Sequence, residues 1–104
     1  MEYKFEVLIP EQDIARVPYP QMLISNMKDG SLKVTVYFME NKALQITGGI
    51  ARAGKGRVKL YYEAISPSGA YTASVEINKV AYIFPNPEGM AGNFEFLGNR
   101  RIKK

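Results

Sequence analysis

The chain alternates apolar and polar residues with a period of two over most of its length, which constrains the fold more than any other feature. The clearest stretch is SLKVTVYFME (31–40), where four apolar side chains would share one face of a strand. The opposite face would carry Lys33, Thr35, Tyr37 and Met39. Side chains of a strand point to opposite faces in turn, so this pattern predicts a half-buried β-strand.

The same period predicts further strands at 3–9, 21–27, 43–48, 57–65, 71–84 and 93–98, separated by glycine- and proline-rich turns. Within 71–84 the apolar parity slips, which predicts a bulge near Asn78 and Lys79. Pro10 to Ala15 has room for one helical turn, and Pro18 and Pro20 end any helix there. No stretch predicts a helix of three turns.

We therefore expect an all-β protein with six to seven short strands, built as a small barrel or a compact sandwich. A barrel is favoured, because bulges bend strands as closure requires. The 104 residues are enough for one hydrophobic core, and no repeat or linker divides them. We expect one domain over 1–99 and a basic C-terminal tail over 100–104.

The sequence has no histidine and no cysteine. These absences exclude Ser-His-Asp and Cys-His nucleophiles, thiolate metal sites and disulfides. Catalysis would have to rest on carboxylates, lysine or tyrosine. The sequence therefore predicts a protein that is not an enzyme and that holds no cofactor and no metal.

The N-terminal stretch MEYKFEVLIPEQD lacks the basic leader and apolar core of a secretory signal. No run of about 18 apolar residues is present either. We expect a cytoplasmic protein without a membrane partner.

Positive charge lies in two blocks of the sequence. Residues 41–60 contain five cations and no acid, whereas 61–99 contain one cation and four acids. The second basic block is the tail, with Arg100, Arg101, Lys103 and Lys104. Such blocks favour a polyanionic partner, although a solvated hairpin and a solubilising tail would have the same composition.

The stretch GIARAGKG (49–56) matches seven of eight positions of the phosphate-binding loop G-x-x-x-x-G-K-[ST]. The eighth position is Gly56 instead of the hydroxyl residue that holds Mg²⁺, and a strand pattern follows where a helix is needed. We therefore interpret it as a glycine-rich hairpin loop. Either this loop has no special role, or Arg52, Lys55 and Arg57 bind a phosphate backbone.

Two predicted strands combine cations with an outward tyrosine: Lys33 with Tyr37, and Arg57 and Lys59 with Tyr61. Proteins that bind single-stranded nucleic acid use cations along the backbone and aromatic rings against the bases. The alternative is that both tyrosines are cross-strand partners or are buried against another layer or subunit.

The small β-rich domain, basic glycine-rich hairpin and outward tyrosines together resemble the oligonucleotide-binding fold of small phage-type single-stranded DNA-binding proteins. The chain differs in lacking an evident helix between the third and fourth strands. The resemblance implies an origin in a phage or mobile element and a barrel that binds single strands.

We expect a non-catalytic protein that binds single-stranded DNA or RNA. The expected binding residues are Lys33, Tyr37, Arg52, Lys55, Arg57, Lys59, Tyr61, Arg100 and Arg101. The alternative is an accessory or inhibitory protein-interaction module, suggested by apolar residues expected to be exposed at Met39, Ile65, Ile83 and Leu97. The sequence leaves the oligomeric state open, and a homodimer is one state that it allows.

Overall fold

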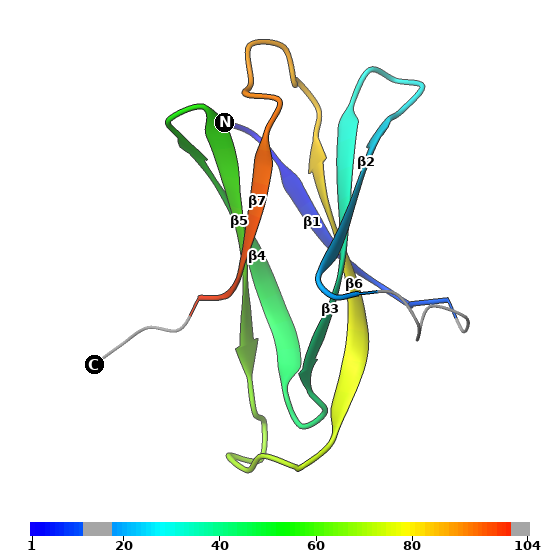
Figure 1. Ribbon diagram of the computed structural model, residues 1–104, viewed down its shortest axis with the longest axis vertical. Coiled ribbons are helices and arrows are strands. Elements are labelled where there is room, and N and C mark those ends of the chain that lie inside the picture. The colour runs from blue at the N-terminus through cyan, green and yellow to red at the C-terminus, as the bar shows by residue number, and fades with distance from the viewer. Residues whose placement is uncertain (12–17, 101–104) are drawn as a thin grey trace.

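A computed structural model describes residues 1–11 and 18–100 of the chain. The described residues form seven strands and no helix, as expected for an all-β protein (Figure 1). The strands are β1 (Lys4–Leu8), β2 (Gln21–Asn26), β3 (Leu32–Asn41), β4 (Gln45–Gly54), β5 (Arg57–Ile65), β6 (Val75–Phe84) and β7 (Phe94–Asn99).

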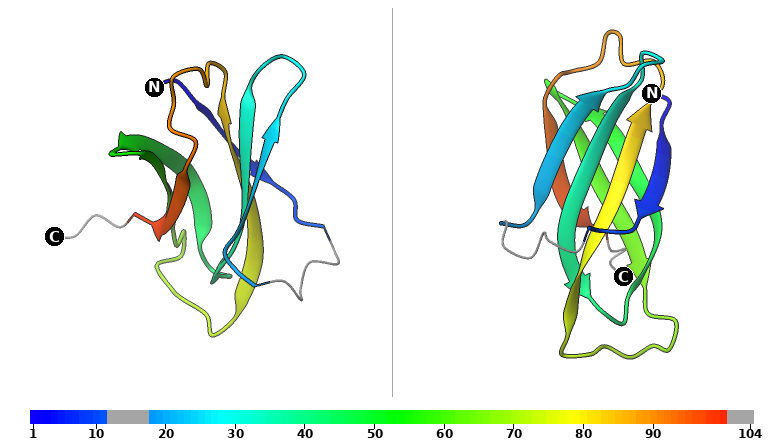
Figure 2. Two further views of the ribbon diagram at one scale, coloured as in Figure 1. Left: turned by 45° about the horizontal axis from the view of Figure 1, so that its top comes forward. Right: turned by 90° about the vertical axis from the view of Figure 1, so that its right-hand side faces the viewer.

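The strands build two sheets that pack as a sandwich (Figure 2). Sheet A has the order β1-β6-β3-β2, with every pair antiparallel. Sheet B has the order β4-β5-β7, in which β4 and β5 form an antiparallel hairpin and β7 runs parallel to β5. A parallel neighbour requires a long connection, and the chain crosses through sheet A in β6 before it returns as β7.

The core lies between the sheets and follows the period of the sequence. β3, β6 and β5 supply most of its fully buried side chains, which are Val34, Val36, Val80, Tyr82, Phe84, Val58 and Leu60. The aromatic rings of Tyr3, Phe5, Phe94 and Phe96 pack against this cluster from β7 and from the N-terminal segment. Alternation in β3 and β5 thus assigns one face of each strand to the core and points the other face away from it.

The favoured barrel is wrong, because no strand pairing joins the two sheets within the described residues. β1 meets β4 through side chains instead. The Phe5 ring occupies the space that a Cβ at Gly49 would need, and the Tyr3 hydroxyl donates to the Gly49 carbonyl oxygen at 3.3 Å. Gly49 thus lets the two sheets approach face to face, where a barrel would continue the ladder from strand to strand.

Two local predictions also differ from the structure. β4 continues through the glycines to Gly54, so most of the expected loop is strand. β6 pairs with β3 in unbroken register from Val75 to Phe84, so the bulge near Asn78 and Lys79 is absent. The helical turn considered from Pro10 to Ala15 and the tail after Arg100 fall outside the described residues, 12–17 and 101–104.

Candidate nucleic-acid interface

The outer face of sheet B brings together the basic residues of the β4–β5 hairpin. In β5, Val58, Leu60 and Tyr62 are buried, so the intervening Lys59 and Tyr61 point outward. The register places Arg52 of β4 directly opposite Lys59, and Ile50 opposite Tyr61. We call the surface formed by Arg52, Lys55, Lys59 and Tyr61 the basic face.

Arg52 and Lys59 are like charges at directly opposed positions of neighbouring strands. Such pairs destabilise a sheet unless an anion compensates them. In the described part of the chain, the two ion pairs are Arg57–Glu95 and Lys79–Glu11, and neither involves Arg52 or Lys59. Neither cation thus forms an ion pair within the described residues, although the register also places Glu95 of β7 opposite Lys59, where it contacts Arg57.

Arg57 differs from the other cations of the hairpin. Its guanidinium donates to the Glu95 carboxylate on β7 at 2.9 Å, and both side chains are about half exposed. Its charge is thus partly offset within the protein, so Arg57 is a weaker candidate for a phosphate contact than Arg52 or Lys59.

The hairpin tip is a two-residue turn, Lys55-Gly56, between the paired residues Gly54 and Arg57. Gly56 has a φ of +73°, which a side chain would strain, and Lys55 is exposed. The tip is followed directly by β5, so the helix that a nucleotide-binding loop needs is replaced by a strand. The segment presents cations from a paired β-hairpin, and only its last two residues form a turn.

A shallow groove of 460 Å³ runs beside the hairpin on this surface. It is lined by Lys55, Arg57, Lys59, Glu95 and Leu97. We call it the basic groove. It has three cations against one carboxylate, which favours an anionic occupant.

Tyr61 lies at the end of the basic face, half-buried between its neighbours on β4 and β7. On β7 the register opposite Tyr61 falls on Gly98, and apart from Gly98 and its two chain neighbours no residue has an atom within 4 Å of the position that a Cβ there would take. The absence of a side chain at Gly98 leaves open space at the strand position opposite Tyr61.

The structure places Lys33 and Tyr37 on a different surface, the outer face of sheet A. Tyr37 points away from the core, as expected, but only 7% of it is exposed. Its hydroxyl donates to the Glu11 carboxylate at 2.8 Å, and the Lys79 ammonium lies over its ring, 5.4 Å from the centroid. Glu11 also accepts a hydrogen bond from the Lys79 ammonium. The ring of Tyr37 is therefore enclosed and has no open side for a base.

The contacts of Glu11 change how this group titrates. Hydrogen bonds from Lys79 and then from Tyr37 lower the pKa of Glu11 to about 2. The hydrogen bond to Glu11 in turn raises the pKa of Lys79, and burial raises the pKa of Tyr37. Glu11 is thus held ionised at neutral pH between its two donors.

Arg100 extends the line of β7, and its backbone N–H donates to the Tyr62 carbonyl at 2.7 Å. It lies half-buried at the end of sheet B. The backbone contact fixes where the chain leaves the sheet. Arg101, the other expected tail contact, lies outside the described residues.

Of the apolar residues expected at the surface, Met39, Ile65 and Leu97 are exposed and Ile83 is half-buried. Sequence reasoning did not connect Glu95 or Glu11 with the basic residues. Alternation in NFEFLG does indicate that Glu95 points away from the core, but its contact with Arg57 depends on the parallel pairing of β7 with β5. Long-range pairing of this kind leaves no local signal.

Comparisons with protein-family models, curated proteins and solved structures found no significant match to this chain. Within residues 1–11 and 18–100, no three acidic side chains gather as metal ligands would. No helix of that part of the chain is long and apolar enough to cross a membrane.

Proposed function

We propose that the protein binds single-stranded nucleic acid, without catalysis, on the basic face of sheet B. The observation that carries the proposal is the directly opposed pair Arg52 and Lys59 with Lys55 at the hairpin tip, none of which forms an ion pair within the described residues. A phosphate backbone along the hairpin would supply the missing anions.

Tyr61 supports a single strand as the partner rather than a duplex. Its ring lies on the same face as Lys59, two residues away, with open space at Gly98. Unpaired bases offer ring surfaces for stacking, whereas stacked bases inside a duplex do not. Compared with the sequence-based expectation, the proposed site omits Lys33 and Tyr37, because these lie on the outer face of sheet A.

The proposal is tested by fluorescence anisotropy of labelled dT and rU oligonucleotides, and of a duplex, across a salt series. Three cations on three phosphates predict that log K falls with log[salt] with a slope of about −2 for single strands. We expect the duplex to bind more weakly than the single strands at each salt concentration. Absence of binding at low salt would rule the function out.

A protein-interaction module is the second candidate. The observation that favours it is the exposure of Met39 and Leu97, two large apolar side chains on neighbouring parts of the two sheets. Light scattering of the purified protein, together with a pull-down, tests this candidate. A stable protein complex that forms without nucleic acid would favour it over strand binding.

A further inference from the structure

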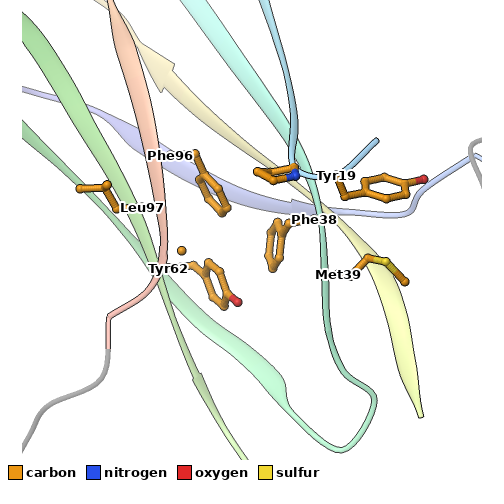
Figure 3. Close-up of a pocket in the computed structure, with 8 residues that line it drawn as sticks. Tyr19, Phe38, Met39, Tyr62, Phe96 and Leu97 are labelled. Atoms are coloured by element: carbon orange, nitrogen blue, oxygen red, sulfur yellow. The ribbon is translucent and has the colours of Figure 1, made fainter. Parts of the chain in front are cut away.

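An aromatic pocket lies between the two sheets, outside the residues of the basic face. It has a volume of 360 Å³ and is lined by Tyr19, Pro20, Phe38, Met39, Tyr62, Phe96, Leu97 and Gly98. Figure 3 shows Phe38, Tyr62 and Phe96 grouped between the ribbons, with Met39 and Leu97 on opposite sides of the group. We call this space the aromatic pocket.

The floor of the pocket consists of ring surfaces. Phe38 and Tyr62 stack with centroids 4.3 Å apart, and Phe96 lies 5.9 Å from Tyr62 in a nearly parallel orientation. The Tyr62 hydroxyl donates to the Glu40 carboxylate, so the polar end of this ring is already occupied. The three rings therefore offer flat apolar surface, which suits a flat ring as an occupant.

The rim of the pocket differs from its floor. Phe38 and Tyr62 are at most 4% exposed, whereas Met39 is 47% and Leu97 is 42% exposed. The buried rings thus lie below a rim that carries two exposed apolar side chains. Ligand pockets commonly measure about 300–1,000 Å³, so a space of 360 Å³ suits one small ring system.

The position of the pocket connects it to the basic face. Leu97 lines both the basic groove and the aromatic pocket, so the two spaces adjoin across β7. Gly98, which lines the pocket, lies opposite Tyr61 of the basic face. A chain with an anionic backbone and flat side groups, held by Lys55 and Lys59, would pass the mouth of the pocket at this edge.

We infer that the aromatic pocket takes one unpaired base of the bound strand, inserted between Met39 and Leu97 and stacked against the rings below. This inference rests on the proposed function, because the phosphate contacts on the basic face bring the strand to the pocket. The occupant is recognised by its ring surface, since the hydroxyl of Tyr62 is already bonded to Glu40. Binding through the pocket should therefore accept any of the bases, but it should require that the strand carries bases.

The first test compares two single strands of equal length on the unaltered protein, dT12 and a strand in which every base is removed. Both carry the same phosphates, so both should bind the basic face, and the base-containing strand should bind about ten-fold or more tightly. Equal affinity would overturn the pocket and leave phosphate binding intact. If neither strand bound at low salt, the proposed function itself would fail, and the pocket inference with it.

The second test locates the base dependence with the variants Phe96→Leu and Phe94→Leu. Both residues lie on β7, are half-buried and pack against the core, but only Phe96 lines the aromatic pocket. Leucine preserves most of the apolar volume and removes the ring. Phe96→Leu should reduce the advantage of dT12 over the abasic strand several-fold, whereas Phe94→Leu should leave it unchanged.

Two further results would contradict the insertion of a base into the aromatic pocket. If Tyr61→Ala abolished the base dependence and Phe96→Leu did not, the base would stack on the outer face and the pocket inference would be wrong. Photocrosslinking with a strand that contains 5-iodouracil needs no variant. Crosslinks at Phe38, Tyr62 or Phe96 support insertion, and crosslinks found elsewhere, or none at all, contradict it.

Discussion

The outer faces of the two sheets carry similar residues in different surroundings. Each face combines lysine with an outward tyrosine: Lys33 and Tyr37 on sheet A, and Lys59 and Tyr61 on sheet B. On sheet A, Glu11 bonds to the Tyr37 hydroxyl and to Lys79, and so neutralises a cation and encloses a ring. On sheet B the cations Arg52 and Lys59 face each other and form no ion pair within the described residues, since the Glu95 carboxylate opposite Lys59 contacts Arg57.

This difference shows that an outward position in a strand does not establish exposure. Alternation assigns Tyr37 and Tyr61 to outer faces correctly, since both are out of phase with the residues of their strands that belong to the core cluster between the sheets. Whether the ring is then available depends on segments far away in the sequence, because Glu11 is 26 positions from Tyr37. The two faces should therefore respond differently to substitution, sheet A in stability and sheet B in strand binding.

The largest expected effect comes from exchanging the two tyrosines for alanine. Tyr37→Ala should lower the free energy of unfolding by about 2–4 kcal/mol, because a nearly buried ring and its hydrogen bond are lost. Tyr61→Ala should weaken strand binding about ten-fold, as one stacking contact is lost, and should leave stability nearly unchanged. Urea unfolding and fluorescence anisotropy measure the two effects.

Tyr37→Phe and Tyr61→Phe are the matched controls, since each keeps the ring and removes only the hydroxyl. Tyr37→Phe should lose less stability than Tyr37→Ala, and Tyr61→Phe should bind nearly as well as the original protein. The account fails if Tyr37→Ala leaves the fold stable and weakens binding as much as Tyr61→Ala does.

A smaller effect concerns the pH dependence that Glu11 gives to sheet A. The pKa of Glu11 is lowered from its ordinary 4.5 to about 2 in the folded protein, so the folded state favours the ionised form. Its contribution to stability is therefore complete above about pH 4.5 and is lost as the pH falls toward 2. The amide of Glu11→Gln cannot titrate, so this variant should lack that part of the pH dependence.

Urea unfolding of the original protein and of Glu11→Gln at several pH values between 6 and 2 measures whether the stability contribution of Glu11 falls on acidification. The difference in unfolding free energy between the original protein and Glu11→Gln should be greatest at pH 6 and should shrink as the solution becomes acidic. A difference that grows on acidification would contradict the contacts of Glu11 with Lys79 and Tyr37.

The smallest expected effect is on the stability of the basic face itself. Arg52→Thr removes one member of a directly opposed like-charge pair, and it should stabilise the free protein by about 0.2–1 kcal/mol at low salt. The gain should shrink at high salt, where the repulsion is screened. Lys33→Thr is the control, since Lys33 lies opposite Ile83 and Ser25 and has no opposed cation. Equal gains in both variants would mean that repulsion is not the cause.

Much of the fold follows from the local sequence pattern, and the predictions that were wrong have physical causes. β3 and β5 were predictable because long alternating runs leave one register that buries the apolar face. β4 was predicted too short because Gly48, Gly49 and Gly54 have low strand propensity, yet Gly49 is where Phe5 packs. The parity slip at Asn78 reflects the end of the core along β6, where Glu76 and Asn78 replace apolar residues in an unbroken register.

The candidate site was predictable only in part, for a related reason. Arg52, Lys55 and Lys59 come from one hairpin, so their proximity follows from the sequence once the turn is recognised. The separation of Lys33 and Tyr37 from them depends on which sheet each strand joins. The aromatic pocket depends on contacts between β3, β5 and β7, which only the packing of the two sheets creates.

The most direct test of the central claim compares two double variants in the same salt series. Arg52→Ala with Lys59→Ala removes two charges from sheet B, and Lys4→Ala with Lys33→Ala removes two from the outer face of sheet A. The account predicts that the first variant reduces the steepness of the salt dependence for dT12 by about 1.4 and that the second leaves it unchanged. Equal reductions by both, or a reduction by the second alone, would contradict the assignment of binding to the basic face.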